Sequence, residues 1–496
     1  MMTNPIAFIS ESEMTVRTGE DYLAGLRDSR EVWLGAAQVD IGSHPAFFGS
    51  LQGMAGYYDW QLANSEACLV EDPESGQTMN ASLIIPKTAD DLRRRRLAFE
   101  TFARYSKGAL GRTPDYVNAT LAGFVGRRDI FEHLGAQRFA DNLKGFYRRV
   151  IDRDLALTHA IVHPSIDKSV GDTYGLNGRL SLRVVRRTSN SIVVRGAKVL
   201  ATLGPFADEL FVYPGAPQSH EIDPAYVIAF TTPLAAKGLI TLCRDHYGAR
   251  ESGPDAPFSS WFDEQDAVMI FDDVEIPLEN VFVDGDVNLY NTLMSDGWNA
   301  NILQQTCARA AVKLEFLYDI CVEIARVTHC EWRPDVMSLL GEIWSFGAMT
   351  RSALDAAEAH AEARGPTVMC DERPLRAVRA HMPAWMARAG DAVKMLGAHN
   401  LLATPSLAAF DHPRLGPLLH EFLPGAQGVS ARDRARLFRI AWDFVGSALA
   451  ERTELYERFY LGSAPRLFGI DHAIAQSEKP VASSDFGAAM PYKATA

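Results

Sequence analysis

Hydrophobic and polar positions along the 496-residue chain change their spacing twice, which predicts three structural regions. The first region, residues 1–153, is expected to be mainly α-helical. It opens with a short helix and a hairpin-like element, expected over residues 18–40. Longer helices are expected over residues 88–108, 113–128 and 131–152.

The second region, residues 154–285, is expected to be a compact β domain. It starts with an extended segment, residues 155–164, because β-branched residues are frequent there and Pro164 biases His163 away from helix. Gly, Pro and Asn clusters separate the apolar runs that follow. The expected strands are residues 180–187, 191–202, 209–214, 225–232, 239–244 and 267–274.

The third region, residues 286–463, is expected to be a four-helix bundle, because apolar residues recur at i, i+3, i+4 and i+7. The tail, residues 464–496, is rich in proline and alanine and is expected to reach over a neighbouring subunit. The fold class is therefore α+β, with an N-terminal α domain, a central β domain and a C-terminal bundle. The expected bundle helices are residues 301–327, 336–364, 372–403 and 431–462.

Charge and cysteine usage narrow the class of protein. Asp and Glu outnumber Lys and Arg by 62 to 49, which argues against a generic binder of nucleic acid or anionic membranes. No apolar run is long enough to span a bilayer, and the first residues lack the pattern of a signal peptide. The six cysteines are scattered without a C-x-x-C pair, which is typical of a reducing compartment. We expect a cytoplasmic protein.

Several cofactor and nucleophile motifs are missing from the sequence. It contains no G-x-G-x-x-G after a strand, no P-loop, no H-E-x-x-H and no G-x-S-x-G. A self-contained nicotinamide-binding domain is therefore not expected. The run Arg93–Arg96 invites a phosphate-binding interpretation, but its members point in different directions around a helix. A solvated helix face with one internal salt bridge is the plainer interpretation.

The stretch Gly111–Asn118 (GRTPDYVN) is a candidate site. Thr113 followed by Pro114 opens a helix, with the threonine oxygen expected to cap it. Arg112 then lies just before the helix and Tyr116 just inside it. A guanidinium, a phenol and a helix N-terminus converge there and could hold an anionic or phenolic oxygen. A structural turn is the alternative interpretation.

Two further stretches carry candidate chemistry. His159 and His163 are about 13 Å apart if the segment is extended, too far to share an ion, so no metal site is expected. The plainer interpretation of His159 in an apolar strand is a hydrogen-bonded core histidine. The segment Gly196–Asp208 ends a strand in Thr202-Leu-Gly-Pro, where a flat ligand can approach the backbone. A plain hairpin would have the same sequence pattern.

Three segments in this order, GRTPDYVN, LTHAIVHPSIDKS and GAKVLATLGPFADE, resemble the oxygenase component of 4-hydroxyphenylacetate 3-monooxygenase. FDEQDAVMIFDDVEIPLENVF, LQQTCARAAVKLEFLYDI and LYERFYLG continue the resemblance, which covers about Thr18 to Gly462. Members of this family are two-component, flavin-dependent aromatic hydroxylases with the acyl-CoA dehydrogenase fold. The resemblance implies an α domain, a central β domain and a four-helix bundle, in the order that the periodicity predicts.

The resemblance also implies an activity. A separate NAD(P)H:flavin reductase would supply FADH2, which would react with O2 to a flavin C4a-hydroperoxide and hydroxylate a phenol ortho to its hydroxyl group. Arg112, Tyr116 and His159 match the family residues that surround the phenol oxygen and the peroxide. Histidine accepts protons near neutral pH, and a fixed cation stabilises a phenolate. A homotetramer is the expected assembly, with no nucleic-acid or membrane partner.

Contacts to the flavin are likewise implied by the resemblance. His163 stands where many relatives carry asparagine, which leaves its role open. The substrate is also open among free 4-hydroxyphenylacetate, a chlorophenol, a tyrosine derivative and a carrier-bound aromatic intermediate. The residues expected to contact FAD are His159, Ala160, Ile161, Thr202, Gly446 and Ser447.

Three alternative functions are weighed against this one. A 4-hydroxybutyryl-CoA dehydratase, which binds flavin and an iron–sulfur cluster, would need cysteines around the GRTPDY motif, and residues 104–112 contain none. An acyl-CoA dehydrogenase would need an acidic base over the flavin and a CoA cleft, and we can place neither. A catalytically silent relative is opposed by the presence of all three expected site residues.

Overall fold

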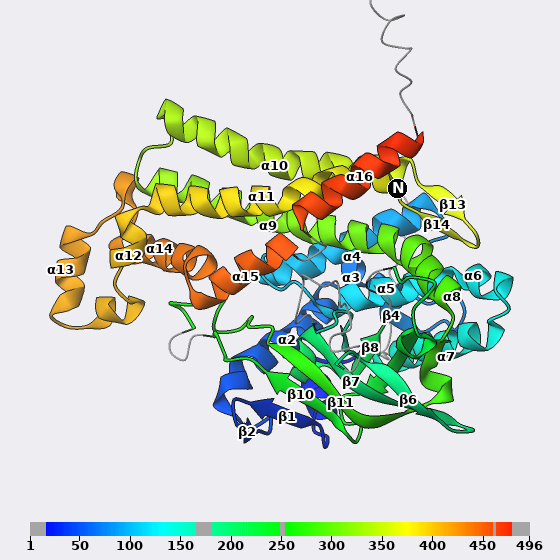
Figure 1. The fold of residues 1–496 in the computed structure, drawn as a ribbon. Helices are drawn as coiled ribbons and strands as arrows, with labels where there is room; N and C mark the ends of the chain where they lie inside the picture. Colours follow the sequence, from blue (N-terminus) through cyan, green and yellow to red (C-terminus); the bar gives the residue numbers. More distant parts are fainter. Residues whose placement is uncertain are drawn as a thin grey trace, which may run out of the picture.

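A computed structural model describes residues 16–164, 180–213, 215, 217–248, 253–459 and 463–478. Part of the LTHAIVHPSIDKS segment, the last residues of the fourth predicted bundle helix and the tail beyond residue 478 lie outside these described residues. Helices form one side of the molecule and strands the other, as Figure 1 shows. Of the residues described, none belongs to a helix that is both long and apolar enough to cross a membrane.

The N-terminal region contains the short helix and hairpin that the sequence predicts, α1 (Gly19–Gly25), β1 (Glu31–Leu34) and β2 (Ala37–Gln38). It also contains a long helix, α2 (Pro45–Ala63), which was not predicted. The imidazole of His44 accepts a hydrogen bond from the backbone N–H of Ala46 at its start, and Pro45 is its first residue. The buried residues of α2 lie along one side, but apolar residues such as Phe48, which is 64% exposed, also lie on the other side. The helix therefore lacks the apolar/polar contrast by which helices are found in a sequence.

The helices after residue 88 agree with the sequence pattern, whereas the short helix over residues 65–68 was not predicted. Helix α4 begins with a capping box formed by Thr88 and Asp91. One predicted helix near residues 131–152 is two, because the chain turns between α6 and α7. The elements are α3 (Ser65–Cys68), β3 (Leu69–Glu71), β4 (Thr78–Asn80), α4 (Ala89–Ser106), α5 (Pro114–Gly126), α6 (Arg128–His133) and α7 (Gln137–Arg153).

The four consecutive arginines on α4 do not form the solvated face that the sequence suggested. Arg95 is only 1% exposed, and its Nε and Nη2 atoms donate to Oε1 of Gln304 at 3.1 and 2.9 Å. Arg94 donates to the backbone carbonyls of Ala67 and Leu69. These two arginines therefore join α4 to other elements, because a buried guanidinium needs acceptors for its N–H groups.

Two main sheets make up the β region. A six-stranded sheet has the order β2-β1-β10-β11-β7-β6, and a four-stranded sheet has the order β12-β9-β8-β5. Strand β1 lies parallel to β10, so the N-terminal hairpin extends the large sheet. All six strands that the sequence predicts are present: the strand over residues 191–202 has the predicted bounds, and the others differ at one or both ends. The sequence did not predict β12, nor the short strands over residues 69–71, 78–80, 362–364 and 367–369. The strands are β5 (Leu157–His159), β6 (Arg183–Arg187), β7 (Ser191–Thr202), β8 (Glu209–Val212), β9 (Ile228–Pro233), β10 (Leu239–Cys243), β11 (Asp266–Pro277) and β12 (Val281–Asp284).

The C-terminal region is helical, as predicted. Its fourth predicted helix is two helices, α14 and α15, because the chain breaks at Gly446 and Ser447. The elements are α8 (Val287–Thr292), a π-helical turn (Leu293–Trp298), α9 (Asn299–Val327), α10 (Pro334–Ala359), β13 (Glu362–Arg364), β14 (Thr367–Met369), α11 (Glu372–Gly397), α12 (His399–Ala403), α13 (Leu415–Phe422), α14 (Ala431–Val445), α15 (Ala448–Phe459) and α16 (Ala464–Glu478).

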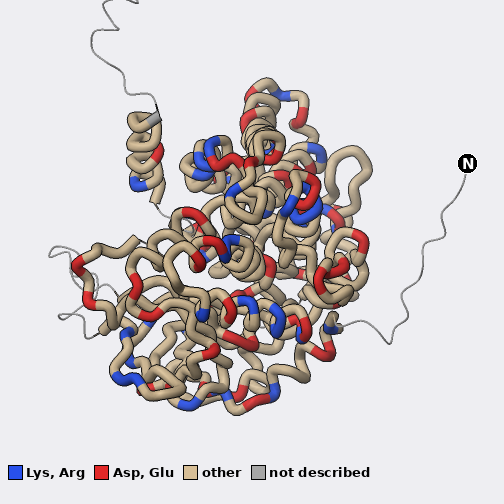
Figure 2. The backbone as a smooth tube through the Cα atoms, turned by 90° about the vertical axis from the view of Figure 1, so that its right-hand side faces the viewer, with Lys and Arg blue, Asp and Glu red and all other residues tan. Residues whose placement is uncertain are grey.

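Helix α5 lies where the three regions meet. It contacts α9 of the helical C-terminal region and β5 of the four-stranded sheet. Its residues are buried along almost the whole length. Acidic and basic residues are interspersed along the chain in the view of Figure 2, and the net charge of −13 is not gathered in one element there. A ligand site is therefore expected at the buried junction around α5 rather than on a charged face.

Candidate active site

Three predicted site residues lie together at the start of α5. The guanidinium carbon of Arg112 lies 3.9 Å from the centroid of the Tyr116 ring. The Tyr116 ring also stacks on the imidazole of His159, with centroids 5.2 Å apart and planes 24° from parallel. Arg112 and Tyr116 are one helical turn apart, whereas His159 comes from the end of β5. One phenol ring therefore contacts both a cation and an imidazole.

The start of α5 differs in one respect from the prediction. Thr113 is the N-cap residue, but its side chain makes no capping hydrogen bond. Its hydroxyl instead hydrogen-bonds the carboxylate of Asp115, which also accepts from the hydroxyl of Tyr57 and from Nε2 of Gln305. Burial nevertheless raises the pKa of Asp115. The first turn of α5 is thus fixed by a hydrogen-bonded, buried carboxyl group rather than by a threonine cap.

His159 is buried in a positively charged and apolar environment. Burial, and secondarily the charge of Arg112, hold the pKa of its imidazole well below the usual value. The ring is therefore neutral at physiological pH. Its Nδ1 atom is buried and has no hydrogen-bond partner among the described residues. A neutral imidazole with an unused nitrogen can accept a proton or a hydrogen bond from a ligand.

Aromatic side chains extend the site beyond His159. The Tyr213 ring lies 5.5 Å from the His159 ring, and the Trp298 ring lies 6.4 Å from Tyr213, measured between centroids. Trp298 belongs to the π-helical turn that precedes α9, a type of irregularity that is frequent at functional sites. This wall is suited to the faces of planar rings.

The residues expected to contact a flavin after His159 are engaged mainly through their backbones. The N–H of Ala160 donates to the carbonyl of Phe211 at 3.2 Å, and the carbonyl of Ile161 accepts from Nζ of Lys198 at 3.2 Å. The hydroxyl of Thr202 donates to Asp266 at 2.9 Å, which leaves its oxygen able to accept. Ala160 and Ile161 directly follow β5, and Thr202 is the last residue of β7.

Lys198 is a buried cation next to this segment that the sequence had not singled out. It is 4% exposed, and its Nζ lies 3.2 Å from Nε2 of His163. Burial lowers the pKa of Lys198 to about 7, and burial and Lys198 together lower that of His163 to about 3. His163 is thus a neutral acceptor for Lys198, which gives this histidine a structural partner.

Gly446 and Ser447 form the junction of α14 and α15. The N–H of Gly446 donates to the carbonyl of Trp442 and ends α14. The hydroxyl of Ser447 accepts from the N–H of Ala450 at 3.1 Å and donates to the carbonyl of Asp443 at 2.7 Å. These contacts account for the helix break, and the role of both residues in cofactor binding stays a prediction.

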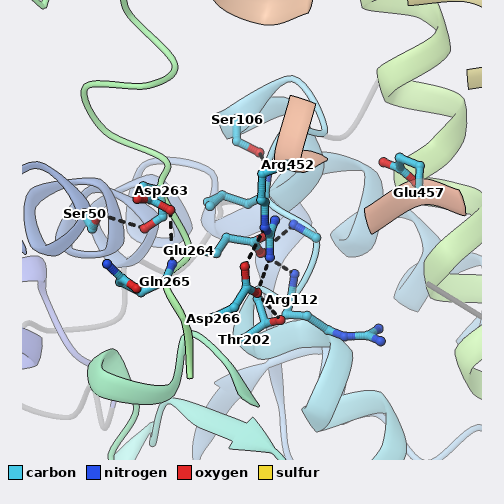
Figure 3. Close-up of polar contacts among 12 residues, drawn as sticks. Ser50, Ser106, Arg112, Thr202, Asp263, Glu264, Gln265, Asp266, Arg452 and Glu457 are labelled. Atoms are coloured by element: carbon cyan, nitrogen blue, oxygen red, sulfur yellow. Dashed lines mark hydrogen bonds and ion pairs between the residues drawn. The ribbon is translucent and has the colours of Figure 1, made fainter. Parts of the chain in front are cut away.

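Sequence reasoning missed a network of ion pairs among Glu264, Asp266 and Arg452 that contacts the backbone of Arg112. Figure 3 shows Glu264 and Asp266 directed at the guanidinium of Arg452 from α15. Glu264 also accepts from the backbone of the Arg112 loop, and Asp266 from Thr202. Both acids lie in the FDEQDAV segment quoted for the family resemblance, which was the available clue. In the described part of the chain, no group of three or more His, Cys, Asp or Glu residues is arranged to bind a metal ion.

Comparison with known proteins identifies similar sequences over most of the chain. The families described as 4-hydroxyphenylacetate 3-hydroxylase N terminal and C terminal match residues 18–283 and 293–467. The 4-hydroxyphenylacetate 3-monooxygenase oxygenase component of Thermus thermophilus is 32% identical over 456 residues, which are 91% of this chain and 93% of the relative. A Streptomyces globisporus monooxygenase, named for a (3S)-3-amino-3-(3-chloro-4-hydroxyphenyl)propanoyl group on a peptidyl-carrier protein, is 33% identical over 469 residues, which are 90% of this chain and 85% of the relative.

Solved structures are also similar to this chain over most of its length. The oxygenase component of 4-hydroxyphenylacetate 3-monooxygenase, complexed with FAD and 4-hydroxyphenylacetate, superposes with a TM-score of 0.86 at 33% identity and covers 91% of this chain and 94% of its own. A 4-hydroxybutyryl-CoA dehydratase from N. maritimus superposes with a TM-score of 0.82 at 18% identity and covers 97% of this chain and 100% of its own. At 18% identity the second similarity concerns the fold alone.

Proposed function

Because the chain belongs to the 4-hydroxyphenylacetate 3-hydroxylase family, we propose that it is the oxygenase component of a two-component monooxygenase that hydroxylates a phenol ortho to its hydroxyl group. The observation that carries this proposal is the contact of the Tyr116 ring with both the Arg112 guanidinium and the His159 imidazole. It combines a fixed cation with a neutral proton acceptor, which are the two groups that phenol activation needs.

FAD, the cofactor of the similar solved structure, fits the residues present. The supporting observations are the buried Nδ1 of His159, the buried cation of Lys198 and the remaining acceptor capacity of Thr202. We propose that His159, Ala160, Ile161 and Thr202 hold FAD, with Gly446 and Ser447 as further contacts. Bound in its reduced form, FAD would supply, together with O2, the oxygen atom that enters the phenol.

The chain's own residues would activate and orient the phenol. His159, neutral at physiological pH, accepts the hydroxyl proton or a strong hydrogen bond from it. A phenolate is more nucleophilic at its ortho carbon than a phenol. The Arg112 guanidinium stabilises the negative charge on the oxygen, and the Tyr116 ring contacts both this guanidinium and the imidazole of His159. Burial of all three residues excludes water and strengthens these interactions.

The proposal includes partners and an assembly. As an oxygenase component the chain requires a separate flavin reductase. We further propose a homotetramer, supported by large apolar side chains exposed in the helical C-terminal region, such as Met337 at 59%, Trp344 at 60% and Leu402 at 78%. Light scattering after size-exclusion chromatography tests this, and the mass of a single chain would contradict it. The six free thiols support a reducing, cytoplasmic location.

We also propose the predicted boundaries as domain limits: residues 1–153, 154–285 and 286–463, followed by a tail over 464–496. The hairpin of β1 and β2 lies within residues 1–153 but is assigned to the β domain, because both strands belong to the large sheet. Limited proteolysis with mass spectrometry tests these limits.

The test of function combines the purified chain with a generic NADH:flavin reductase, FAD and air. A panel of free phenols and one carrier-tethered phenol is supplied, and catechol products are identified by mass spectrometry. Formation of an ortho-hydroxylated product from at least one phenol is expected. A protein that binds FAD but yields no hydroxylated product from any of them would instead be a silent relative or another flavoenzyme of this fold.

A further inference from the structure

Glu264 makes contact with the backbone from which Arg112 projects. One of its carboxylate oxygens, Oε1, accepts from the N–H of Gly111 and from the N–H of Arg112, both at 2.6 Å. The side chain of Glu264 is fully buried. A carboxylate that accepts two consecutive backbone N–H groups restricts the orientation of that peptide segment. The position of the Arg112 side chain relative to Tyr116 therefore depends on Glu264.

The other oxygen of Glu264 pairs with Arg452 of α15, with Oε2 and Nη1 2.6 Å apart. Arg452 also binds the carboxylate of Asp266, with its Nε 2.7 Å from Oδ2. Asp266 in turn accepts from the hydroxyl of Thr202 at 2.9 Å. One buried guanidinium thus connects the acid that holds the Arg112 loop to the acid that holds Thr202, as Figure 3 shows.

A second contact between α15 and the Arg112 loop supports this arrangement. The Tyr456 ring has the guanidinium of Arg452 4.7 Å from its centroid and that of Arg112 5.6 Å from it. A Cβ added at Gly111 would lie 2.4 Å from a carbon of the Tyr456 ring. The loop therefore approaches α15 at a distance that only glycine permits. Movement of α15 would displace the backbone of residues 111 and 112.

We propose that Glu264 is the positioning residue for Arg112, that Asp266 is the positioning residue for Thr202, and that Arg452 is the ion-pair partner of both acids. This inference rests on the proposed function, in which Arg112 contacts the phenol and Thr202 contacts FAD. Each acid acts on a different ligand. The removal of one charge should therefore disturb one ligand and leave the other largely bound.

Binding of 4-nitrophenol to the protein without FAD tests the role of Glu264 at the phenol site. The phenolate of 4-nitrophenol is yellow, so its ionisation can be followed directly. In the wild type, a correctly placed Arg112 should lower the titration midpoint of the bound phenol below that of free 4-nitrophenol. In Glu264→Gln, Kd should rise about tenfold and the midpoint should shift upward by about 1 pH unit. FAD affinity, measured by fluorescence quenching, should stay within about twofold of the wild type.

Asp266→Asn should show the opposite pattern, with FAD binding weakened about tenfold and the 4-nitrophenol midpoint unchanged. Glu264→Asp keeps the charge and should recover part of the midpoint shift. In an Arg112→Ala background, Glu264→Gln should have no further effect on 4-nitrophenol, since a positioning residue acts only through the residue that it positions.

Glu457→Gln is the matched control. Glu457 is also a buried glutamate that ties α15 to another element, through ion pairs with Arg309 and Lys313 of α9, and its carboxylate accepts from these two side chains rather than from the N–H groups of residues 111 and 112. The Glu457→Gln variant should have a lower melting temperature but an unchanged titration midpoint of bound 4-nitrophenol. A midpoint that is the same in the wild type, Glu264→Gln and Glu264→Asp would overturn the inference. If the wild type binds no 4-nitrophenol and hydroxylates no phenol, the proposed function fails instead and the inference fails with it.

Discussion

The guanidinium carbon of Arg112 lies 3.9 Å from the centroid of the Tyr116 ring, and the same ring stacks on His159. Cation–π contact and ring stacking together order three polar side chains in a buried place. Burial also keeps His159 neutral while Arg112 stays charged. The pair of a permanent cation and a neutral base is the basis of the predictions below.

Replacement of His159 by alanine should leave FAD binding intact but lower the rate of hydroxylation about 100-fold or more, because the base at the phenol is lost. Oxygen consumption should continue and yield hydrogen peroxide. Product and peroxide are measured together for each O2 consumed. His133→Ala is the control, because His133 is an exposed histidine whose Nδ1 hydrogen-bonds the carbonyl of Asp129. Unchanged coupling in His159→Ala would remove His159 from the mechanism.

Arg112→Ala should raise the KM for the phenol at least about tenfold and reduce the yield of product, since it removes the cation that lies over Tyr116. Arg112→Lys should recover little, because a lysine lacks the planar group that lies over the ring. Steady-state kinetics with a saturating reductase measure both. Arg128→Ala removes an exposed arginine paired with Glu132 and should behave as the wild type. A normal KM and yield in Arg112→Ala would count against the site.

Asp115 should tolerate asparagine better than alanine. Burial raises the pKa of this carboxyl above its unfolded value, so its contribution to stability is greatest at low pH and declines as pH rises through the folded pKa. A neutral amide keeps most hydrogen-bonding positions without the buried charge. Asp115→Ala leaves Tyr57 and Gln305 without this partner and should cost about 1–3 kcal/mol. Urea unfolding at pH 5 and pH 8 measures both variants, and equal losses in the two would contradict this expectation.

Lys198→Met should stabilise the protein most in acid. The pKa of Lys198 is about 7 in the folded protein and about 10.4 in an unfolded chain. The unfolded chain therefore binds the proton more tightly, and the penalty is complete below pH 7 and disappears as pH rises towards 10. Thermal unfolding between pH 6 and pH 10 should show a variant advantage that shrinks with rising pH. Lys394→Met, which removes an exposed lysine paired with Glu451, should show no such trend. A constant difference across this range would argue that Lys198 is not a buried cation.

Local patterns determined most of the helices and strands, with α2 and β12 as exceptions, and the likeness to a family determined the class of enzyme. The spacing of Arg112 and Tyr116 by one turn follows from the helix that Pro114 opens, so their proximity was readable from the sequence. The strand that ends in His159 was also readable, because its residues favour extended backbone.

Only the tertiary structure decided which distant residues complete the site. The ring stacking of Tyr116 on His159 depends on the contact of α5 with β5, which no local pattern encodes. Glu264 and Arg452 are acidic and basic residues like many others until folding buries them together behind Arg112. Arg95, predicted to be solvated, is buried against Gln304 for the same reason. Burial and long-range pairing are properties of the packed chain, whereas helix starts and strand periods are properties of neighbouring residues.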